Sequence, residues 1–427
     1  ALLAWYNETR APSLRRRIED LVAGLDHVMV KRGDYGFYDR AAIEPGASVS
    51  SDADPMPHQI YFSGPQIHPL VACWQQLGLE AAGELAGRLA KFLFRNNDYF
   101  FADGRWRVGG SGGFGSAESD GHSHARLAAI AGTAHWARLT NNDTLAACAR
   151  RAYDWFVDTY CAEFGWSPEF IGRGDIAEEA CETCVIMDQL HCAFAFAAAG
   201  DAAQYEKIER IVRNQLFENQ LIDTSPIHST RPKPETGQSS FTDVAARVRG
   251  GFAGWAGVND FVGNSPHSRN LMNCCGPAGI RSVYEAWANS SSRTGDGKLR
   301  INIYLDHQSE LVSLRNSQPV SGEMEILPHC TAELQLRPRS WLNPAMLEVL
   351  VNGAARTPQT TGSYISLGRV SPGDRVQVRC PLDAVTETVG VNGREFTVTW
   401  HGDTVVAMQP PGSAVPLYRG RNPSDNE

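Results

Sequence analysis

The sequence has little that would mark a membrane protein, a nucleic-acid-binding protein or a disulfide scaffold. No apolar run approaches the roughly 18–20 residues of a membrane-spanning helix. The formal net charge is -9, and no block of lysine and arginine stands out, which argues against a nucleic-acid partner. Ten cysteines in 427 residues are too sparse for a disulfide scaffold. What is left is an ordinary globular composition, with 42% hydrophobic and 20% charged residues.

The N-terminal residues Ala-Leu-Leu-Ala-Trp-Tyr-Asn-Glu lack the basic region and the cleavage pattern of a signal peptide. We therefore expect a cytoplasmic location and no membrane partner. The sequence does not begin with methionine, so processing or trimming of an upstream segment stays open.

Apolar residues recur at helical spacing through the first part of the chain. Short turns with capping residues connect these segments, which favours antiparallel neighbours and predicts a helical domain over residues 1–295. The predicted helices cover residues 13–30, 69–94 with a break near Gly78, 122–139, 144–160, 179–199, 201–221 and 276–289.

The pattern changes after a Ser/Gly-rich stretch at residues 290–297, where apolar and polar residues begin to alternate. Alternation over short segments, with Asn-Gly and Pro-Gly-Asp turns between them, is typical of antiparallel strands. The clearest strands are residues 299–305, 332–337, 347–353 and 376–380. The sequence therefore predicts a mainly α N-terminal domain followed by a C-terminal antiparallel β-sandwich over residues 296–427.

A long segment without clear periodicity, residues 222–270, leads directly into two adjacent cysteines. It is rich in Gly, Ser, Pro and Thr and carries Trp255, His267 and Arg269. A loop of this length in a compact domain is usually functional or disordered. We favour a role in lining a pocket.

Two short motifs offer the ligands of a metal site. Cys274 and Cys275 are adjacent and precede Gly-Pro, while Glu182 and Cys184 form a Glu-Thr-Cys motif. Three thiolates and one carboxylate make a ligand set that zinc accepts. Both motifs lie at predicted helix starts, where the helix dipole stabilises anions. Four unrelated residues and a purely structural zinc are the alternatives.

The stretch Cys-Cys-Gly-Pro-Ala-Gly-Ile-Arg from Cys274, together with Glu-Thr-Cys from Glu182, resembles the β-L-arabinofuranosidase family, glycoside hydrolase family 127 and its relatives. The stretch from His122 to Gly132 is a second match, and Leu-Arg-Pro-Arg-Ser-Trp-Leu from Leu336 is a weaker third. Together the matches cover most of the chain from about residue 90 onward.

This resemblance implies an (α/α)6-barrel-like helical domain and a zinc ion held by Glu182, Cys184, Cys274 and Cys275. It implies that Cys274, the first cysteine of the pair, is the nucleophile of a retaining glycosidase. His122 takes the place of a histidine that contacts the sugar in the family.

The sequence departs from the family where the acid/base is expected. The Gly-Glu-Ala-Phe-Gly stretch that carries the family's acid/base glutamate is not recognisable, and Cys-Cys-Gly-Pro-Ala stands for the family's Cys-Cys-Pro-Pro-Asn. The chain also offers fewer clear helices than the twelve of a complete barrel. The remaining acid/base candidates are Glu163, Glu169, Glu178 and Glu179. We prefer Glu169, which follows a proline in a Gly/aromatic loop; an exposed loop carboxylate is the alternative.

Substrate contacts are predicted for His122, His124, Trp166 and His267, with Tyr38 and Trp255 as further aromatic candidates. Core packing is the alternative for His124 and for the tryptophans.

The sequence thus predicts a zinc-dependent retaining glycoside hydrolase that acts on β-L-arabinofuranosides or related sugars of plant or microbial glycans. Its partner is a carbohydrate substrate, and a homodimer is the candidate assembly. Two alternatives stay open. One is a helical-barrel polysaccharide lyase or unsaturated-uronide hydrolase, and the other is a non-catalytic protein that binds zinc or carbohydrate.

Overall fold

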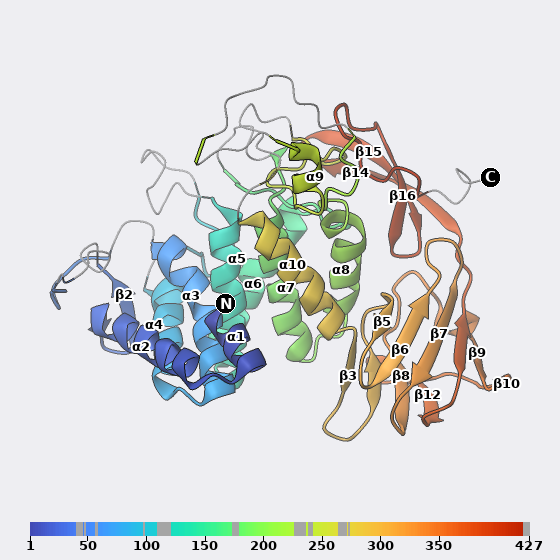
Figure 1. Cartoon of the computed structure of the whole chain (residues 1–427), viewed down its shortest axis with the longest axis horizontal. Helices are drawn as coiled ribbons and strands as arrows, with labels where there is room; N and C mark the ends of the chain where they lie inside the picture. Colours follow the sequence, from blue (N-terminus) through green and yellow to red (C-terminus); the bar gives the residue numbers. More distant parts are fainter. Residues whose placement is uncertain are drawn as a thin grey trace. The chain divides into compact units, whose positions relative to one another are not determined.

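A computed structural model describes residues 1–39, 46, 48–55, 59–96, 99–108, 121–172, 179–225, 236–237, 242–263, 271 and 274–421 (Figure 1). The chain forms two compact units. The first comprises Ala1–Tyr160 and Pro168–Glu178, and the second comprises Cys161–Ser167 and Glu179–Glu427.

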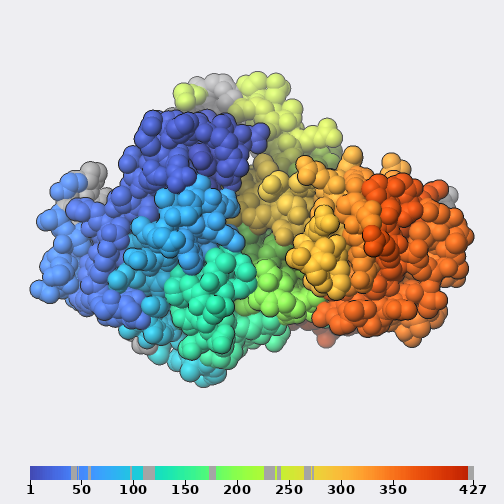
Figure 2. All heavy atoms as spheres, turned by 90° about the horizontal axis from the view of Figure 1, so that it is seen from below, coloured from blue at the N-terminus to red at the C-terminus, as the bar shows by residue number. Residues whose placement is uncertain are grey.

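The first unit is built almost entirely of helices, with one short hairpin. Its helices are α1 Leu2–Thr9, α2 Pro12–Val28, α3 Gln59–Leu77, α4 Glu80–Arg95, α5 Ser123–Leu139 and α6 Asp143–Tyr160, and its hairpin joins β1 Met29–Arg32 to β2 Tyr35–Tyr38. The predicted break between α3 and α4 is confirmed, because Gly78 has a φ of 69° that ends α3. Figure 2 shows one face of this unit, formed largely by its blue N-terminal residues.

Small residues bring α3 and α5 into close contact at the centre of the first unit. A Cβ atom on Gly64 of α3 would lie 2.8 Å from the carbonyl oxygen of Ala125 on α5. A Cβ atom on Gly132 of α5 would lie 2.7 Å from the Cβ of Ile67 on α3. Both glycines are therefore required for this packing distance, which fixes the start of α5 and the adjacent His122.

The second unit begins with helices and continues as strands. Its helices are α7 Thr183–Ala198, α8 Gln204–Arg210 with a π-helical continuation Ile211–Leu216, α9 Val244–Val248 and α10 Cys275–Ala288. From Ser291 onward the regular structure is almost all strand, apart from the short 3-10 helix Pro344–Met346. The predicted fold class, helices followed by antiparallel sheets, is confirmed. A domain boundary at residues 295–296 stays a prediction.

The described strands from β3 onward form three sheets. Their strand orders are β10-β9-β13-β7-β6-β5, β11-β12-β8-β4-β3 and β14-β15-β16. Their bounds are β3 Ser291–Arg293, β4 Leu299–Ile301, β5 His307–Gln308, β6 Val312–Asn316, β7 Glu323–Pro328, β8 Ala332–Leu336, β9 Glu348–Val351, β10 Ala354–Ala355, β11 Gln359–Thr361, β12 Tyr364–Val370, β13 Val376–Arg379, β14 Ala384–Val391, β15 Arg394–His401 and β16 Thr404–Gln409.

The six-stranded and five-stranded sheets share one apolar core and so form the predicted sandwich. Leu299 and Leu334 of one sheet and Ile326 and Val376 of the other belong to the same buried cluster. The sandwich differs from the prediction in one pairing, because β4 and β8 run parallel. Strands β5–β7, which lie between them in the chain, belong to the opposite sheet, so the chain returns to β8 through a crossover.

A buried ionic network joins α8 to the sandwich within the second unit. The Glu209 carboxylate accepts hydrogen bonds from Arg337 at 2.7 Å, from Arg213 at 2.8 Å and from the backbone N–H of Tyr304 at 3.0 Å. Burial alone would raise the pKa of Glu209, but the charges of Arg213 and Arg337 hold it at about 2.

Within the described residues, no helix is both long enough and apolar enough to span a membrane.

Candidate metal centre

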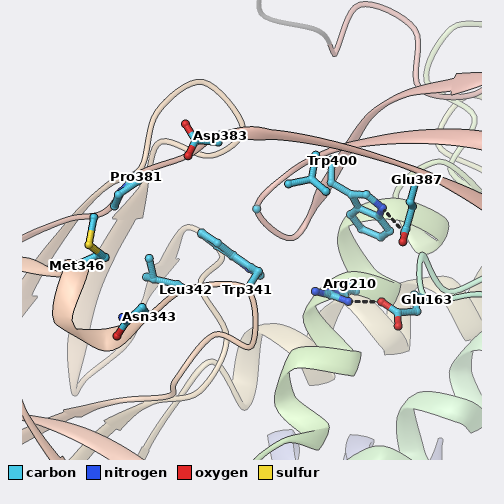
Figure 3. A pocket seen from close by; sticks show the side chains of 12 residues that line it. Glu163, Arg210, Trp341, Leu342, Asn343, Met346, Pro381, Asp383, Glu387 and Trp400 are labelled. Atoms are coloured by element: carbon cyan, nitrogen blue, oxygen red, sulfur yellow. Dashed lines mark hydrogen bonds and ion pairs between the residues drawn. The ribbon is translucent and has the colours of Figure 1, made fainter.

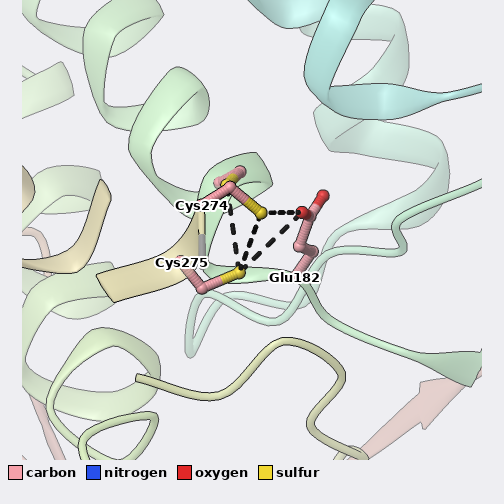
Figure 4. Close-up of side chains that lie close together, drawn as sticks. Glu182, Cys274 and Cys275 are labelled. Carbon is pink, nitrogen blue, oxygen red and sulfur yellow. Dashed lines mark hydrogen bonds between the residues drawn. The ribbon is translucent and has the colours of Figure 1, made fainter. Parts of the chain in front are cut away.

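The four side chains predicted to bind metal converge on one point in the second unit (Figure 4). The Sγ atom of Cys275 lies 3.9 Å from the Sγ atoms of Cys184 and Cys274. The Oε1 atom of Glu182 lies 3.5 Å from the Sγ of Cys274 and 3.8 Å from that of Cys275. One ligand atom from each residue lies within 4.8 Å of all the others.

These separations are those of ligands arranged around a tetrahedral zinc ion. Zinc–sulfur bonds of about 2.3 Å at the tetrahedral angle place two sulfurs roughly 3.8 Å apart, and a carboxylate oxygen about 3.6 Å from each sulfur. The sulfur pairs are also far beyond the roughly 2.05 Å of a disulfide bond. The residues present therefore fit zinc in both donor type and spacing.

Two helix starts place the ligands on the same side. Glu182 is the N-cap of α7 and has an extended backbone (φ -91°, ψ 134°), whereas Cys184 lies in the first turn of that helix. In mid-helix, residues two apart point to different faces, so the change of backbone conformation at Glu182 is what lets both side chains meet. Cys274 is the N-cap of α10, and Cys275 is its first residue. Both motifs therefore lie at helix starts, as predicted, although α7 begins at Thr183 and not at the predicted residue 179.

Thr183 anchors the Glu-Thr-Cys motif, a role that was not predicted from the sequence. Thr183, between the two ligands, is fully buried, and its hydroxyl donates to the carbonyl oxygen of Ala253 at 2.6 Å and accepts from Asn219 at 3.2 Å. Just before it, Cys181 and Ala256 exchange two backbone hydrogen bonds of 2.7 and 3.0 Å. The residues before α7 are therefore held in place by the segment that follows α9.

A buried histidine connects the two helices that carry the ligands. His191 of α7 lies 2.7 Å from Glu285 of α10 through Nε2 and 3.5 Å from Asp188 through Nδ1. Burial alone would lower the pKa of His191, but its hydrogen bonds to Asp188 and Glu285 raise it. The contact between His191 and Glu285 therefore links α7 to α10, and with them the two halves of the ligand set.

The cluster itself contains no compensating positive group. The hydrogen bond between Cys184 and Cys275, together with burial, raises the pKa of Cys184, and the same hydrogen bond lowers the pKa of Cys275. Burial and the neighbouring charges of Cys275 and Glu182 raise the pKa of Cys274 to about 11. Burial and the neighbouring negative charges thus oppose ionisation of Cys184 and Cys274, and a bound divalent metal would displace their protons.

Cys274 differs from its three neighbours in exposure. Glu182, Cys184 and Cys275 are buried, with 3%, 2% and 0% of their surface exposed, whereas Cys274 is exposed. Of the four residues, Cys274 alone is exposed to solvent. Chemically, a thiol held by a metal and open to solvent is a type of group that can act as a nucleophile.

The preferred acid/base, Glu169, lies in the first unit beside His122. Glu169 is buried, with 6% exposed, and its carbonyl oxygen accepts a hydrogen bond of 2.8 Å from the N–H of Ser123. A carboxylate oxygen of Glu169 and a ring nitrogen of His122 lie within 4.8 Å of each other. The His122 ring stacks on Tyr61 at 4.9 Å and contacts Phe170 at 4.8 Å, and His124 is half-buried next to it.

The other predicted site residues have different surroundings. Trp166 is fully buried in this structure, which favours the core-packing alternative, and a sugar contact stays a prediction. Glu163 is 71% exposed and paired with Arg210, and Glu179 is exposed. His267 and Glu178 lie outside the described residues, so their roles stay predictions.

Comparison with known proteins finds solved structures that share this fold. No protein-family model and no curated protein matches the sequence. A solved structure of a β-arabinofuranosidase of glycoside hydrolase family 127 matches with a TM-score of 0.58 and 15% identity over 85% of this chain and 57% of that one.

Two further solved structures agree. A family 127 β-L-arabinofuranosidase from Geobacillus stearothermophilus T6 matches with a TM-score of 0.54 and 15% identity, over 93% of this chain and 73% of that one. A protein described as a glycoside hydrolase matches with a TM-score of 0.58 and 12% identity, over 95% of this chain and 75% of that one. The chain thus shares the fold of family 127 glycoside hydrolases, as the sequence motifs implied, while spanning 57% of the length of the first of these structures.

Proposed function

We propose that this protein is a zinc-dependent retaining glycoside hydrolase in which Cys274 is the nucleophile. One observation carries the proposal: an exposed thiol completes an otherwise buried set of two thiols and a carboxylate at zinc-binding distances. The fold shared with family 127 structures supports it.

The proposed reaction has two displacements. The Cys274 thiolate attacks the anomeric carbon, the glycosidic C–O bond breaks, and Glu169 as a carboxylic acid donates its proton to the leaving oxygen. Glu169, now a carboxylate, then takes a proton from water, whose oxygen attacks the same carbon while the C–S bond breaks. The thiolate of Cys274 and the acid form of Glu169 are restored, and the configuration of the sugar is retained.

Glu182, Cys184, Cys274 and Cys275 would hold the zinc ion, which when bound lowers the pKa of the thiols and keeps Cys274 ionised at neutral pH. The three buried ligands hold the fourth in position. His122 and His124, at the start of α5, are proposed to donate hydrogen bonds to sugar hydroxyls.

The proposed substrate is a β-L-arabinofuranoside or a related sugar of a plant or microbial glycan. The solved structures of β-arabinofuranosidases with this fold support that choice. A non-catalytic zinc protein that binds carbohydrate is the second candidate. It is favoured by the missing Gly-Glu-Ala-Phe-Gly stretch, because a protein without an acid/base would keep the metal and lose turnover.

A panel of nitrophenyl glycosides that includes furanosides tests the proposal. We expect turnover of the β-L-arabinofuranoside, its loss to below detection in Cys274→Ser, and its retention in the matched control Cys148→Ser, which replaces a half-buried thiol outside the cluster. Absence of turnover on every glycoside, from protein that contains zinc, would favour the non-catalytic alternative.

A second variant tests the acid/base. Glu169→Gln should lower the rate by about 10²–10⁴ on a natural oligosaccharide, the usual worth of general acid–base catalysis. The loss should be smaller on nitrophenyl glycosides, whose leaving group needs little protonation. Full activity of Glu169→Gln on the oligosaccharide would remove Glu169 from the mechanism and make Glu163 or Glu179 the next residue to test.

A further inference from the structure

A cavity of about 370 Å³ lies in the second unit and shares no residue with the thiol cluster (Figure 3). It is lined by α8, the segment between β8 and β9, the residues after β13, and the hairpin strands β14 and β15. Its volume is within the roughly 300–1,000 Å³ of small-molecule sites. Neither the proposed catalytic residues nor the proposed metal ligands account for it.

The cavity is lined by aromatic rings together with hydrogen-bonding groups. Trp341 and Trp400 line it with Asn343, Asp383 and Glu387. Figure 3 shows Trp341 between the side of the cavity that carries Asn343 and the side that carries Trp400. The indole N–H of Trp341 is buried and has no hydrogen-bond acceptor among the described residues, and such a group is usually satisfied by water or by a ligand oxygen.

The geometry of Trp400 is fixed before any ligand binds. Its indole N–H donates to Glu387 at 2.8 Å, and the guanidinium carbon of Arg210 lies 5.3 Å from its ring centroid. Arg210 is itself ion-paired with Glu163 and, at 3.1 Å, with the buried Asp403. The cation–π position on Trp400 is therefore occupied by the protein's own arginine.

The charges of the lining select against ionic ligands. Three carboxylates, Glu163, Asp383 and Glu387, face one guanidinium, so an anionic sugar or a phosphate would meet like charge. A cation gains little, because Arg210 already neutralises Glu163 and covers Trp400. Trp341 also has an arginine over one face of its ring, with the guanidinium carbon of Arg339 5.2 Å from the centroid. What remains is the other face of Trp341, beside carboxylate and amide groups. That combination suits a ligand with apolar C–H faces and many hydroxyls.

We propose that this cavity is a second carbohydrate-binding site, which takes one or two residues of a neutral oligosaccharide against Trp341. The hydroxyls of the sugar donate to Asp383 and Glu387. The ligand class rests on the lining and not on the reaction proposed for Cys274. The site would hold a glycan chain without cleaving it.

Calorimetric titration with neutral pentasaccharides, namely arabino-, xylo- and cellopentaose, tests this site in the Cys274→Ser background, where the proposed turnover is blocked. Adding Trp341→Ala should raise the Kd of at least one pentasaccharide about tenfold. A loss of that size is expected when one aromatic side chain that contacts the ligand is removed. Trp341→Phe should keep most of the affinity and shows that the change is not one of folding. With Cys274 intact, Trp341→Ala should leave turnover of a nitrophenyl monosaccharide within about twofold, because so small a substrate occupies only the reacting site.

The outcomes separate this site from the proposed reaction. Binding that depends on Trp341 in a protein without glycosidase activity supports the second site and contradicts the reaction. Turnover together with pentasaccharide binding that is unchanged in Trp341→Ala contradicts the second site. Binding of tetramethylammonium or of an oligogalacturonate at this cavity, with no neutral pentasaccharide bound, also contradicts it.

Discussion

Two buried polar clusters of the second unit differ in how their charges are balanced. Around Glu209, two arginines and a backbone N–H surround one carboxylate, and the pKa of that carboxylate falls to about 2. Around Cys275, two further thiols and the carboxylate of Glu182 meet without a basic side chain in the set, and the pKa of Cys274 rises to about 11.

This difference distinguishes a structural ion-pair network, around Glu209, from a candidate cation site, around Cys275. Burial of a charge is tolerated when the protein supplies the opposite charge, as Arg213 and Arg337 do for Glu209. A cluster made only of thiols and a carboxylate has no positive group of its own. Its members can all be ionised together only when a bound cation supplies the opposite charge. The first cluster is neutralised by its own arginines, and the second is a candidate metal site.

The largest expected effect comes from unbalancing the complete cluster. Glu209→Gln leaves Arg213 and Arg337 without their shared carboxylate and should lower the free energy of unfolding by about 3–5 kcal/mol, the usual cost of breaking a buried pair. Denaturant unfolding measures this. The control is Glu325→Gln, which removes the partner of the exposed Arg375 and should cost less than about 1 kcal/mol. Equal effects of the two variants would contradict the distinction.

A smaller effect is expected from the histidine that joins α7 to α10. His191→Gln removes the ion pair with Glu285, and we expect zinc affinity to fall about tenfold, because groups that orient metal ligands commonly contribute 10–100-fold to affinity. Competition with a chelator dye measures the affinity. Glu285→Gln and the double variant complete a cycle, in which additive losses would exclude direct coupling between the two residues.

The stabilising effect of this ion pair should depend on pH. The pKa of His191 is raised above its ordinary 6.5, so its contribution is full below that pH and is lost as the pH rises through the raised value. Although burial would raise the pKa of Glu285, the hydrogen bond from His191 holds it at about 2; its contribution is full above its ordinary 4.5 and is lost as the pH falls toward 2. The stability difference between wild type and His191→Gln should therefore be largest between about pH 4.5 and 6.5. A pH-independent difference would contradict the ion pair.

The smallest expected effect concerns the packing of α10. A Cβ atom on Gly279 would lie 2.3 Å from the ring of Phe252, so Gly279→Ala should destabilise the protein by about 1–2 kcal/mol through overpacking. Gly276→Ala, in the first turn of the same helix, meets no atom within 4 Å and should be neutral or stabilising by up to about 1 kcal/mol. Thermal unfolding of the two variants measures their stabilities. A Gly276→Ala variant that is less stable than Gly279→Ala would contradict this packing of α10 against Phe252.

Local signals predicted much of this structure. The start of α5 beside His122, the break at Gly78 and the start of α10 at the Cys-Cys pair were all predicted from local sequence, although neither helix start has a side-chain cap. The convergence of the four ligands was also predicted, because two short motifs of metal-binding residue types carry the information in their composition.

Other features depend on contacts far apart in the sequence. Helix α7 was predicted from residue 179 but begins at Thr183, because Cys181 pairs its backbone with Ala256 instead of continuing the helix. The pairing of Glu209 with Arg337 joins residues 128 positions apart and has no local signature. The full burial of Trp166 likewise depends on its surroundings in the fold and not on its neighbours in the chain.

The zinc content of the purified protein tests the central claim most directly. We predict one tightly held zinc ion per chain by elemental analysis, and a large loss of zinc in Cys184→Ser. The matched control Cys192→Ser, a buried thiol on the same helix outside the cluster, should keep its zinc. Wild-type protein without zinc, or equal zinc in Cys184→Ser and wild type, would contradict the assignment of Glu182, Cys184, Cys274 and Cys275 as a metal site.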